Sequence, residues 1–392
     1  MDNKLGILIA GYCGAISSTV VAGIDLMLQG SLPNIGMICE TTDSNNTTIA
    51  EQLDAPKLEN IVISGWDAID VSIRDALNQH QVLRVSDIAL VSDSVMDKRP
   101  MPIPQNNDKF EYNNGWGSHI EQLRRDIREF KDNFQVDNVV VVNSISTQPT
   151  PTWTNKYDSL AEFKSACKAL DPDITASMEY ACAAILESSG YVNFTPNIVS
   201  VPALQELAVQ KGVPLTGHDG KTGQTLIKTA LAPLLKLRNL TVKGWFSTNI
   251  LGNLDGKALN DPDACQTKIT SKQNCLDSIL GYPVEDHQVH IHYYLPRKDN
   301  KESWDSIDID GFLGYPMQIK VNYLCRDSII AAPLVIDLAR LMAVSMRQGE
   351  SGLLPHLSIF FKSPQLPEGI PVNHDLFIQR KLFFEWVKRS GK

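Results

Sequence analysis

An apolar segment near the start of the chain leads directly into a glycine-containing turn and then into a helical pattern. Leu5–Ala10 predicts a buried strand, and the turn begins at Gly11. Ser17–Gln29 then repeats apolar side chains at helical spacing. A buried strand that turns straight into a helix is the start of a βαβ unit, and such units require a parallel sheet covered by helices.

The same alternation of strands and helices continues to about residue 150. We expect further strands at Asn34–Cys39, Asn60–Ser64 and Asn138–Asn143, and a charged amphipathic helix at Ile120–Phe134. The run NVVVVN at 138–143 is typical of a strand that is covered on both faces. These patterns predict a doubly wound α/β domain.

The pattern changes after about Gly217 and changes again near residue 328. The middle block predicts a more open, antiparallel sheet with one long helix, and the last block predicts long apolar helices. The expected elements are a helix at Gly223–Arg238, strands at Leu240–Ser247, His287–Leu295 and Met317–Tyr323, and helices at Ile329–Met346 and Leu376–Val387.

Composition narrows the possible partners and the compartment. The chain has 392 residues and a formal net charge of −9, with no basic block. An acidic chain of this kind is not expected to bind nucleic acid or an anionic membrane as its main role. Seven cysteines without a CxxC pair indicate reduced thiols and a cytoplasmic protein. No apolar run is long enough to predict a membrane span.

The glycine turn after the first strand is the first candidate binding site. Backbone N–H groups at a helix N-terminus suit a pyrophosphate, so the turn favours a dinucleotide site. Its spacing is GxxGxxS instead of GxGxxG, and a plain βα turn is the alternative. Glu40 is expected to end the second strand, where an acid holds ribose hydroxyls and favours NAD over NADP. A solvated loop glutamate is the alternative for this residue.

Small polar residues follow the strongest predicted strand. Asn143, Ser144, Ser146 and Thr147 would lie at the carboxyl end of a parallel strand, where ligands bind in such sheets. An ordinary polar turn is the alternative interpretation. The segment therefore extends the predicted cofactor site only if the neighbouring glycine turn also contributes to it.

The loop before the long middle helix is the second candidate site. Residues 220–222 (GKT) match the end of a Walker P-loop, but Leu215 stands where the first glycine is required, so that interpretation is excluded. The N–H groups near Thr222 and Gly223 still suit one phosphate. Asp219 beside them would hold a lysine or a metal ion. A plain helix cap is the alternative.

Four lysines are candidates for chemistry. Lys268 and Lys272 would share one face of a helix, and Lys301 follows an Asp-Asn pair. Lys362 has apolar neighbours that would lower its pKa if it were buried. Lysines in a dry site bind phosphate, transfer protons and stabilise oxyanions, whereas a single lysine is usually a solvated surface charge.

Two histidines invite a metal interpretation. His290 and His292 would lie on one face of a strand, but no HExxH motif or supporting carboxylate spacing accompanies them. Structural histidines are therefore the more usual explanation. The sequence does not decide whether the protein requires a metal ion.

Taken together, these motifs resemble the myo-inositol-1-phosphate synthase family, and specifically its short archaeal-type members. The resemblance runs essentially from end to end, and its most specific part is GHDGKTGQT at 217–225 followed by NILGNLDG at 249–256. Further matching segments lie at 64–67, 98–102, 143–149, 193–196, 299–301 and 360–364.

The resemblance implies a fold and a reaction. A Rossmann-type NAD-binding domain (1–217) would be followed by an inserted α+β catalytic and tetramerisation domain (218–326) and a segment returning to the first domain (327–392). The reaction would convert D-glucose 6-phosphate into myo-inositol 1(3)-phosphate for phospholipid biosynthesis. NAD would oxidise C5, the C6 enolate would attack the C1 aldehyde, and NADH would reduce C5 again. A cytoplasmic homotetramer is also implied.

The resemblance also implies residue roles. Lys268 and Lys362 would handle proton transfer and charge at the C5 oxygen. Lys301 would stabilise oxygen charge near C1 and C6 or contact the phosphate, and Lys272 would hold the phosphate with the Thr222 and Gly223 amides. The supporting residues would be Asp219, Asp255, Asp327 and Asn249. The cofactor residues would be Gly11, Tyr12, Gly14, Ala15, Ile16, Ser17, Glu40, Asn143, Ser144, Ser146, Thr147 and Asp219.

Some features depart from the family pattern and leave alternatives open. The chain lacks the GGNN form of the glycine turn, Thr222 replaces a common serine, and His218 is not the usual acid. A divalent metal or a monovalent cation is an open requirement. The competing hypotheses are a related carbocycle-forming enzyme on another sugar phosphate, a net NAD-dependent dehydrogenase, and a non-enzymatic NAD-sensing protein.

Overall fold

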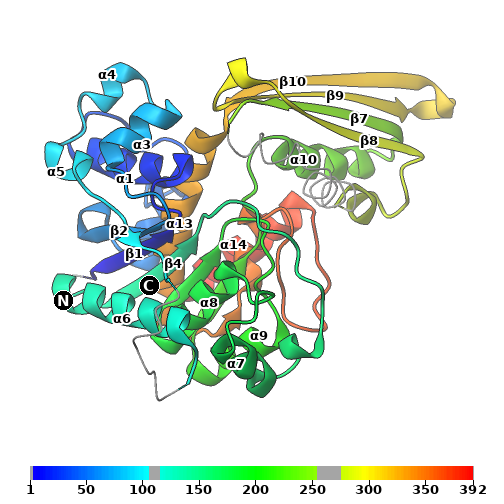
Figure 1. The fold of residues 1–392 in the computed structure, drawn as a ribbon. Coiled ribbons are helices and arrows are strands. Elements are labelled where there is room, and N and C mark those ends of the chain that lie inside the picture. The colour runs from blue at the N-terminus through cyan, green and yellow to red at the C-terminus, as the bar shows by residue number, and fades with distance from the viewer. Residues whose placement is uncertain (1–2, 106–114, 254–274, 392) are drawn as a thin grey trace.

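The computed structural model describes residues 3–105, 115–253 and 275–391. These residues form a seven-stranded sheet with helices on both faces and a four-stranded sheet beside it (Figure 1). Lys268, Lys272 and Asp255 lie outside the described residues, so their predicted roles stay predictions.

The larger sheet is parallel throughout and has the order β11-β6-β5-β4-β1-β2-β3. Its central strand, β1, pairs with β2 on one side and with β4 on the other. The strand order therefore reverses between β1 and β4, which opens a crevice at their carboxyl ends. The strands are β1 (Leu5–Ala10), β2 (Ile61–Asp67), β3 (Met101–Pro102), β4 (Asn138–Asn143), β5 (Gly190–Asn193), β6 (Pro214–Gly217) and β11 (Gly352–Leu353).

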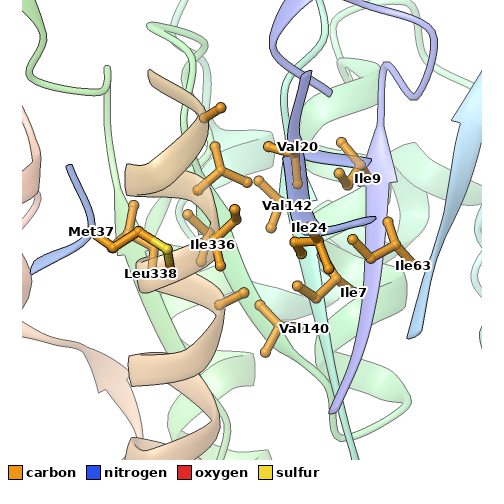
Figure 2. Packing of buried hydrophobic residues seen from close by; sticks show 14 of the residues in the cluster. Ile7, Ile9, Val20, Ile24, Met37, Ile63, Val140, Val142, Ile336 and Leu338 are labelled. Atoms are coloured by element: carbon orange, nitrogen blue, oxygen red, sulfur yellow. The ribbon is translucent and has the colours of Figure 1, made fainter. Parts of the chain in front are cut away.

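Helices bury both faces of this sheet. Alternate side chains of β1 and β4 enter two separate cores, because successive residues of a strand point to opposite faces. Ile7 and Val140 meet Val20, Ile24 and Ile336 from α1 (Ala15–Leu28) and α13 (Asp327–Arg347) in the first core (Figure 2). The second core contains α6 (Ser118–Phe134), α8 (Ala176–Leu186) and α9 (Pro202–Lys211). The predicted doubly wound fold is confirmed.

The smaller sheet has the order β10-β9-β7-β8, with β7 and β8 parallel and the other pairs antiparallel. Its inner face packs on α10 (Gly223–Leu237) (Figure 1). Ala232 and Leu235 of this helix meet Val242 and Trp245 of the sheet. Helical residues 275–280 join the same core. The strands are β7 (Thr241–Leu251), β8 (Asp286–Tyr293), β9 (Asn300–Asp310) and β10 (Pro316–Arg326).

The remaining helices are short or peripheral, except for α14 near the end of the chain. They are α2 (Ile49–Leu53), α3 (Ile73–His80), α4 (Val85–Ile88), α5 (Asp93–Met96), α7 (Leu160–Lys168) and α14 (Leu376–Ser390). In the described ranges, α13 alone has the length and apolar composition of a membrane span. This is weak evidence for a membrane, because 72% of its most apolar stretch is buried in the protein, as in a core helix.

The predicted second strand, Asn34–Cys39, is wrong. The segment is irregular and ends in a short 3₁₀ helix, η1 (Ile38–Glu40). The N–H of Ile38 donates to the Asp337 carboxylate on α13 at 2.5 Å, so it is not available to a strand ladder. The strand paired with β1 on this side is β2, which the sequence pattern placed third.

Candidate active site

A cavity of about 630 Å³ opens at the carboxyl ends of β1 and β4 and reaches β7 and the start of α13. It lies where the strand order of the parallel sheet reverses, which is the usual binding crevice of such folds. Many of the predicted site residues line it together, namely Gly14, Ala15, Ile16, Ser144, Ser146, Thr147, Asp219, Thr222, Asn249, Lys301, Asp327 and Lys362.

The glycine turn is shaped for a bound anion. Gly11 has a φ of +86°, and a Cβ there would lie 2.9 Å from the carbonyl oxygen of Ser144, so the turn requires glycine and packs closely on the loop after β4. Gly14 caps α1 without a side-chain hydrogen bond. The buried Ser17 Oγ has no hydrogen-bond partner among the described residues. Free N–H groups and an unpaired hydroxyl at a helix N-terminus fit a pyrophosphate.

Glu40 does not end a parallel strand, contrary to expectation. It ends η1, and its carboxylate binds Arg340 on α13 at 2.6 Å. The acid that ends the strand beside β1 is Asp67, whose carboxylate accepts the N–H of Cys13 at 2.8 Å. Asp67 therefore has the position that holds ribose hydroxyls in dinucleotide-binding sheets. The sequence analysis missed it because the second strand was misplaced.

Asn143 lies behind the cavity wall and is fully buried. Its side-chain amide donates to Ser177, Asn193 and Thr195 at 3.0–3.2 Å. These bonds fix the end of β4, from which residues 144–147 extend into the cavity. Asn143 thus shapes the loop, and a direct contact with a cofactor stays a prediction.

The Asp219–Lys362 pair forms one wall of the cavity. The Lys362 ammonium lies 2.8 Å from the Asp219 carboxylate, and both side chains are largely buried. The N–H of Lys362 also donates to the backbone carbonyl of Asp219 at 2.8 Å, and the N–H of Asp219 donates to Thr195. Lys362 was expected in an apolar setting, but the structure gives it a carboxylate partner. The loop before α10 is thus held between β5 and residues 360–363.

A second ion pair faces the cavity where β9 meets α13. The Lys301 ammonium lies 3.3 Å from both carboxylate oxygens of Asp327, which also accepts the Thr222 hydroxyl at 3.1 Å. Burial would raise the pKa of Asp327, but Lys301 and Lys362 together lower that pKa to about 2. The Asp327 carboxylate therefore stays ionised at neutral pH. Asp327 also begins α13, where a negative charge suits the helix dipole.

The N-terminus of α10 resembles that of α1 in lacking a side-chain cap. Thr222 occupies the cap position, but its hydroxyl is used by Asp327. The buried Thr225 Oγ1 has no hydrogen-bond partner in the described part of the chain. Gly223 has a φ of +40°, a conformation that favours glycine. The first turn of α10 thus leaves N–H groups for a phosphate from Gly223 onward. The Thr222 N–H already donates to the Gly220 carbonyl at 3.1 Å, so its predicted phosphate contact stays a prediction.

Asp299 is a cavity residue to which the sequence analysis gave no role. It is 5% exposed, and its carboxylate accepts the Ser328 hydroxyl at 2.7 Å. Burial raises the pKa of Asp299 from 3.8 to about 6, and the nearby Asp327 charge adds to the rise. The available signal was its place as the first residue of the Asp-Asn-Lys segment at 299–301, but its burial could not be read from the sequence.

Replacing Asp299 by Asn is expected to stabilise the protein at pH 8 but not near pH 4. Because the folded pKa of Asp299 lies above its unfolded value, this carboxyl's contribution to stability is present below pH 3.8 and is lost as the pH rises through about 6. The neutral amide avoids that loss, which amounts to at most about 3 kcal/mol at pH 8. Urea unfolding at both pH values measures it. The exposed Asp132→Asn is the control, and an equal gain at both pH values would contradict the raised pKa.

The two candidate metal-binding histidines lie away from the cavity. His290 and His292 are exposed on one face of β8, as predicted, with their rings 6.3 Å apart. Within residues 3–105, 115–253 and 275–391, no group of three or more His, Cys, Asp or Glu side chains is arranged to hold a metal ion.

Comparison with known proteins identifies the family of this chain. The profile of an NAD-binding family described as myo-inositol-1-phosphate synthase matches residues 5–388. Inositol-3-phosphate synthase 1 of Bacteroides thetaiotaomicron is 40% identical over 97% of this chain and 94% of its own length. The Dictyostelium discoideum inositol-3-phosphate synthase is 29% identical over 96% of this chain and 84% of its own length.

Solved structures give the same result. The crystal structure of inositol-3-phosphate synthase from Caenorhabditis elegans superposes with a TM-score of 0.88 at 25% identity, over 100% of this chain and 86% of that one. A myo-inositol-1-phosphate synthase-related protein from Thermotoga maritima shares the fold with a TM-score of 0.79 at 23% identity, over 99% and 100% of the two chains. The chain belongs to the myo-inositol-1-phosphate synthase family.

Proposed function

We propose that this protein converts D-glucose 6-phosphate into a myo-inositol phosphate with NAD as a cofactor that is regenerated in each turnover. One observation carries the proposal. Two lysine–carboxylate pairs, Lys362–Asp219 and Lys301–Asp327, face one cavity between the uncapped N-termini of α1 and α10. Such a cavity has room for two phosphate-bearing ligands and for charge that develops between them.

The described residues suit NAD at the α1 end of the cavity. The N–H groups of the first turn of α1, after Gly14, and the unpaired Ser17 hydroxyl would hold the pyrophosphate, and Asp67 would hold the ribose hydroxyls. Ser144 and Thr147 would border the nicotinamide end. Bound NAD supplies a hydride acceptor for the first step and a hydride donor for the last. An acid at the Asp67 position favours NAD over NADP.

The described residues suit the sugar phosphate at the α10 end. The Gly223 amide and the N–H groups that follow it in the first turn would hold the phosphate at the helix N-terminus, together with the predicted Lys272. Lys362, held by Asp219, would transfer a proton at the C5 oxygen with the predicted Lys268. Lys301, held by Asp327, would stabilise the charge that develops on oxygen when the ring closes. The carboxylates keep both lysines oriented.

Turnover with a catalytic amount of NAD⁺ tests this function. Purified protein is incubated with excess glucose 6-phosphate, with divalent and monovalent cations supplied in separate reactions. Phosphorus NMR follows the products, and absorbance follows NADH. We expect an inositol monophosphate in excess over NAD⁺ without NADH accumulation. Stoichiometric NADH would instead identify a dehydrogenase. Unchanged glucose 6-phosphate despite NAD binding would point to another sugar phosphate or to a non-enzymatic NAD sensor.

We further propose a cytoplasmic homotetramer in which the outer face of the four-stranded sheet contacts a second copy. Phe246, Trp304 and Leu324 are 37%, 38% and 61% exposed on that face, and the His290 ring lies 5.0 Å from the Phe246 ring in a tilted arrangement. Exposed apolar side chains on a sheet face support an interface between copies. Light scattering on the purified protein should give four times the chain mass, and Leu324→Asp should lower it. A wild-type monomer at micromolar concentration would contradict the proposal.

A further inference from the structure

A chain of buried hydrogen bonds joins Asp305 to Asn249 in the cavity wall. Gln224 donates its side-chain N–H groups to both Asp305 oxygens at 3.0 Å. Asn249 in turn donates to the Gln224 carbonyl oxygen at 2.6 Å. The three residues are 1%, 3% and 0% exposed in the order Asp305, Gln224, Asn249. Among these three, only Asn249 lines the cavity.

The buried Asp305 fixes which group donates and which accepts in each hydrogen bond of this chain. The Oδ1 atom of Asp305 also accepts the Trp245 indole N–H at 2.8 Å and the Ser247 hydroxyl at 2.6 Å. An ionised carboxylate only accepts hydrogen bonds, so Gln224 must turn its NH₂ group toward it. The Gln224 carbonyl oxygen then faces Asn249, so Asn249 must donate to it with its own NH₂ group.

The free end of the chain is therefore an oxygen. Asn249 Oδ1 is buried and has no hydrogen-bond partner among the described residues. An orphaned buried acceptor costs free energy unless a ligand satisfies it. The partner it requires is a hydrogen-bond donor that arrives with the ligand, such as a sugar hydroxyl.

We propose that Asp305 is a positioning residue that acts through Gln224 to fix Asn249 as an acceptor for a substrate hydroxyl. The proposal rests on the proposed cyclisation of a sugar phosphate, because that substrate supplies the hydroxyl. Asp305 and Gln224 touch no ligand in this account. They determine which end of the Asn249 amide the substrate meets.

The substitution Asp305→Asn should exchange donor and acceptor in each hydrogen bond from position 305 through Gln224 to Asn249. The Trp245 indole only donates, so the oxygen of the new amide must stay at the Oδ1 position and its NH₂ group must face Gln224. Gln224 then turns its carbonyl toward position 305, and Asn249 turns its NH₂ group into the cavity. A substrate hydroxyl meets a donor where it met an acceptor. We expect kcat to fall roughly 100-fold with NAD binding retained.

A carboxyl at position 249 distinguishes positioning from a merely structural role. In Asn249→Asp, the Gln224 carbonyl oxygen still needs a hydrogen-bond donor from position 249. The new carboxyl can donate that hydrogen bond only when it is protonated. In Asn249→Asp with Asp305→Asn, Gln224 offers its NH₂ group, so the new carboxyl satisfies the chain only when ionised. We therefore expect the single variant to lose kcat as pH rises, and the double variant to lose kcat as pH falls. At high pH the double variant should exceed Asp305→Asn by about tenfold.

The two carboxyl variants should also differ in sign in how their stability depends on pH, and stability is measured without any substrate. The folded pKa of the carboxyl at position 249 should lie above its unfolded value in the single variant and below it in the double variant. The melting temperature of the single variant, relative to wild type, should therefore fall as pH rises. That of the double variant, relative to Asp305→Asn, should rise. This measurement decides the orientation of the chain even if glucose 6-phosphate proves not to be the substrate.

Two controls complete the test. Ser247→Ala removes one donor to Asp305 without changing polarity, and we expect kcat within about twofold of wild type. In a Gln224→Met background, the opposite pH dependences of the single and double variants should disappear. If they persist there, direct charge repulsion between positions 305 and 249 causes them. Unchanged kcat in Asp305→Asn, or pH dependences of the same sign in both carboxyl variants, would overturn the proposal. If Asp305→Asn does not fold, the alkaline loss of Asn249→Asp decides the test together with the Gln224→Met background, in which that loss should disappear.

Discussion

The substitution Lys362→Met is expected to lower kcat for inositol phosphate formation by roughly 1,000-fold while NAD binding persists. Lys362 lines the cavity and is held 2.8 Å from Asp219, whereas the α1 turn that would bind the pyrophosphate belongs to another wall. Without the ammonium, a proton donor and a positive charge are both missing near the reacting oxygen. Phosphorus NMR measures kcat, and fluorescence titration measures NAD affinity.

A buried lysine in the loop before α10, which also carries Asp219, provides the matched control. Lys221 is 4% exposed and binds Gln379, but it does not line the cavity. The substitution Lys221→Met removes a comparable buried ammonium, so we expect altered stability with kcat within about threefold of wild type. Normal turnover in Lys362→Met, or equal losses of kcat in both variants, would remove Lys362 from the chemistry.

The substitution Lys301→Met is expected to abolish ring closure and also to destabilise the fold. It leaves the Asp327 carboxylate buried with only Lys362 and Thr222 to stabilise its charge. Breaking one side of a buried pair costs roughly 3–5 kcal/mol. Because the pKa of Asp327 rises without Lys301, the destabilisation should shrink on acidification. Urea unfolding at pH 7 and pH 5 measures this effect.

The double substitution Lys301→Met with Asp327→Asn separates charge balance from catalysis. Removing the unpaired carboxylate should restore much of the lost stability, since no buried charge remains alone at this position. The activity should not return, because the ammonium that stabilises the developing oxygen charge is still missing. Recovery of kcat in the double variant would show that Lys301 serves only to balance Asp327.

The first domain could be predicted because its signals are local in sequence. Residues 5–10 and 138–143 are apolar runs that become β1 and β4 with the predicted bounds. The predicted helices at 120–134 and 223–238 differ from α6 and α10 by one or two residues at an end. Strands buried on both faces and amphipathic helices have composition patterns that burial itself imposes.

The errors arose where tertiary contacts decide the structure. The segment 34–39 is apolar enough for a strand, but Asp337 on α13 captures the Ile38 N–H. β9 was not predicted, although it is central to the smaller sheet, because its inner side chains include Ser303 and Asp305, which pack against other polar groups. Local patterns cannot report a hydrogen bond to a residue about 300 positions away.

Four charged members of the site could be predicted, but their pairings could not. The resemblance placed Asp219, Lys301, Asp327 and Lys362 in one site, and the structure brings all four to the cavity. The partition into two ion pairs depends on how the start of α13 meets β9 and on the course of residues 360–363. The roles of Asp67, Asp299 and Asp305 depend on burial and strand order, which a sequence without its structure does not give.

Glucose 6-phosphate carrying deuterium at C5 tests the central claim most directly. The account requires that the hydride taken from C5 returns to the same carbon within one turnover. With a catalytic amount of NAD⁺, mass spectrometry of the product should show the deuterium fully retained in an inositol monophosphate, with no labelled NADH released into solution. Deuterium recovered in free NADH, with an oxidised sugar phosphate as the product, would contradict the account and identify a net dehydrogenase.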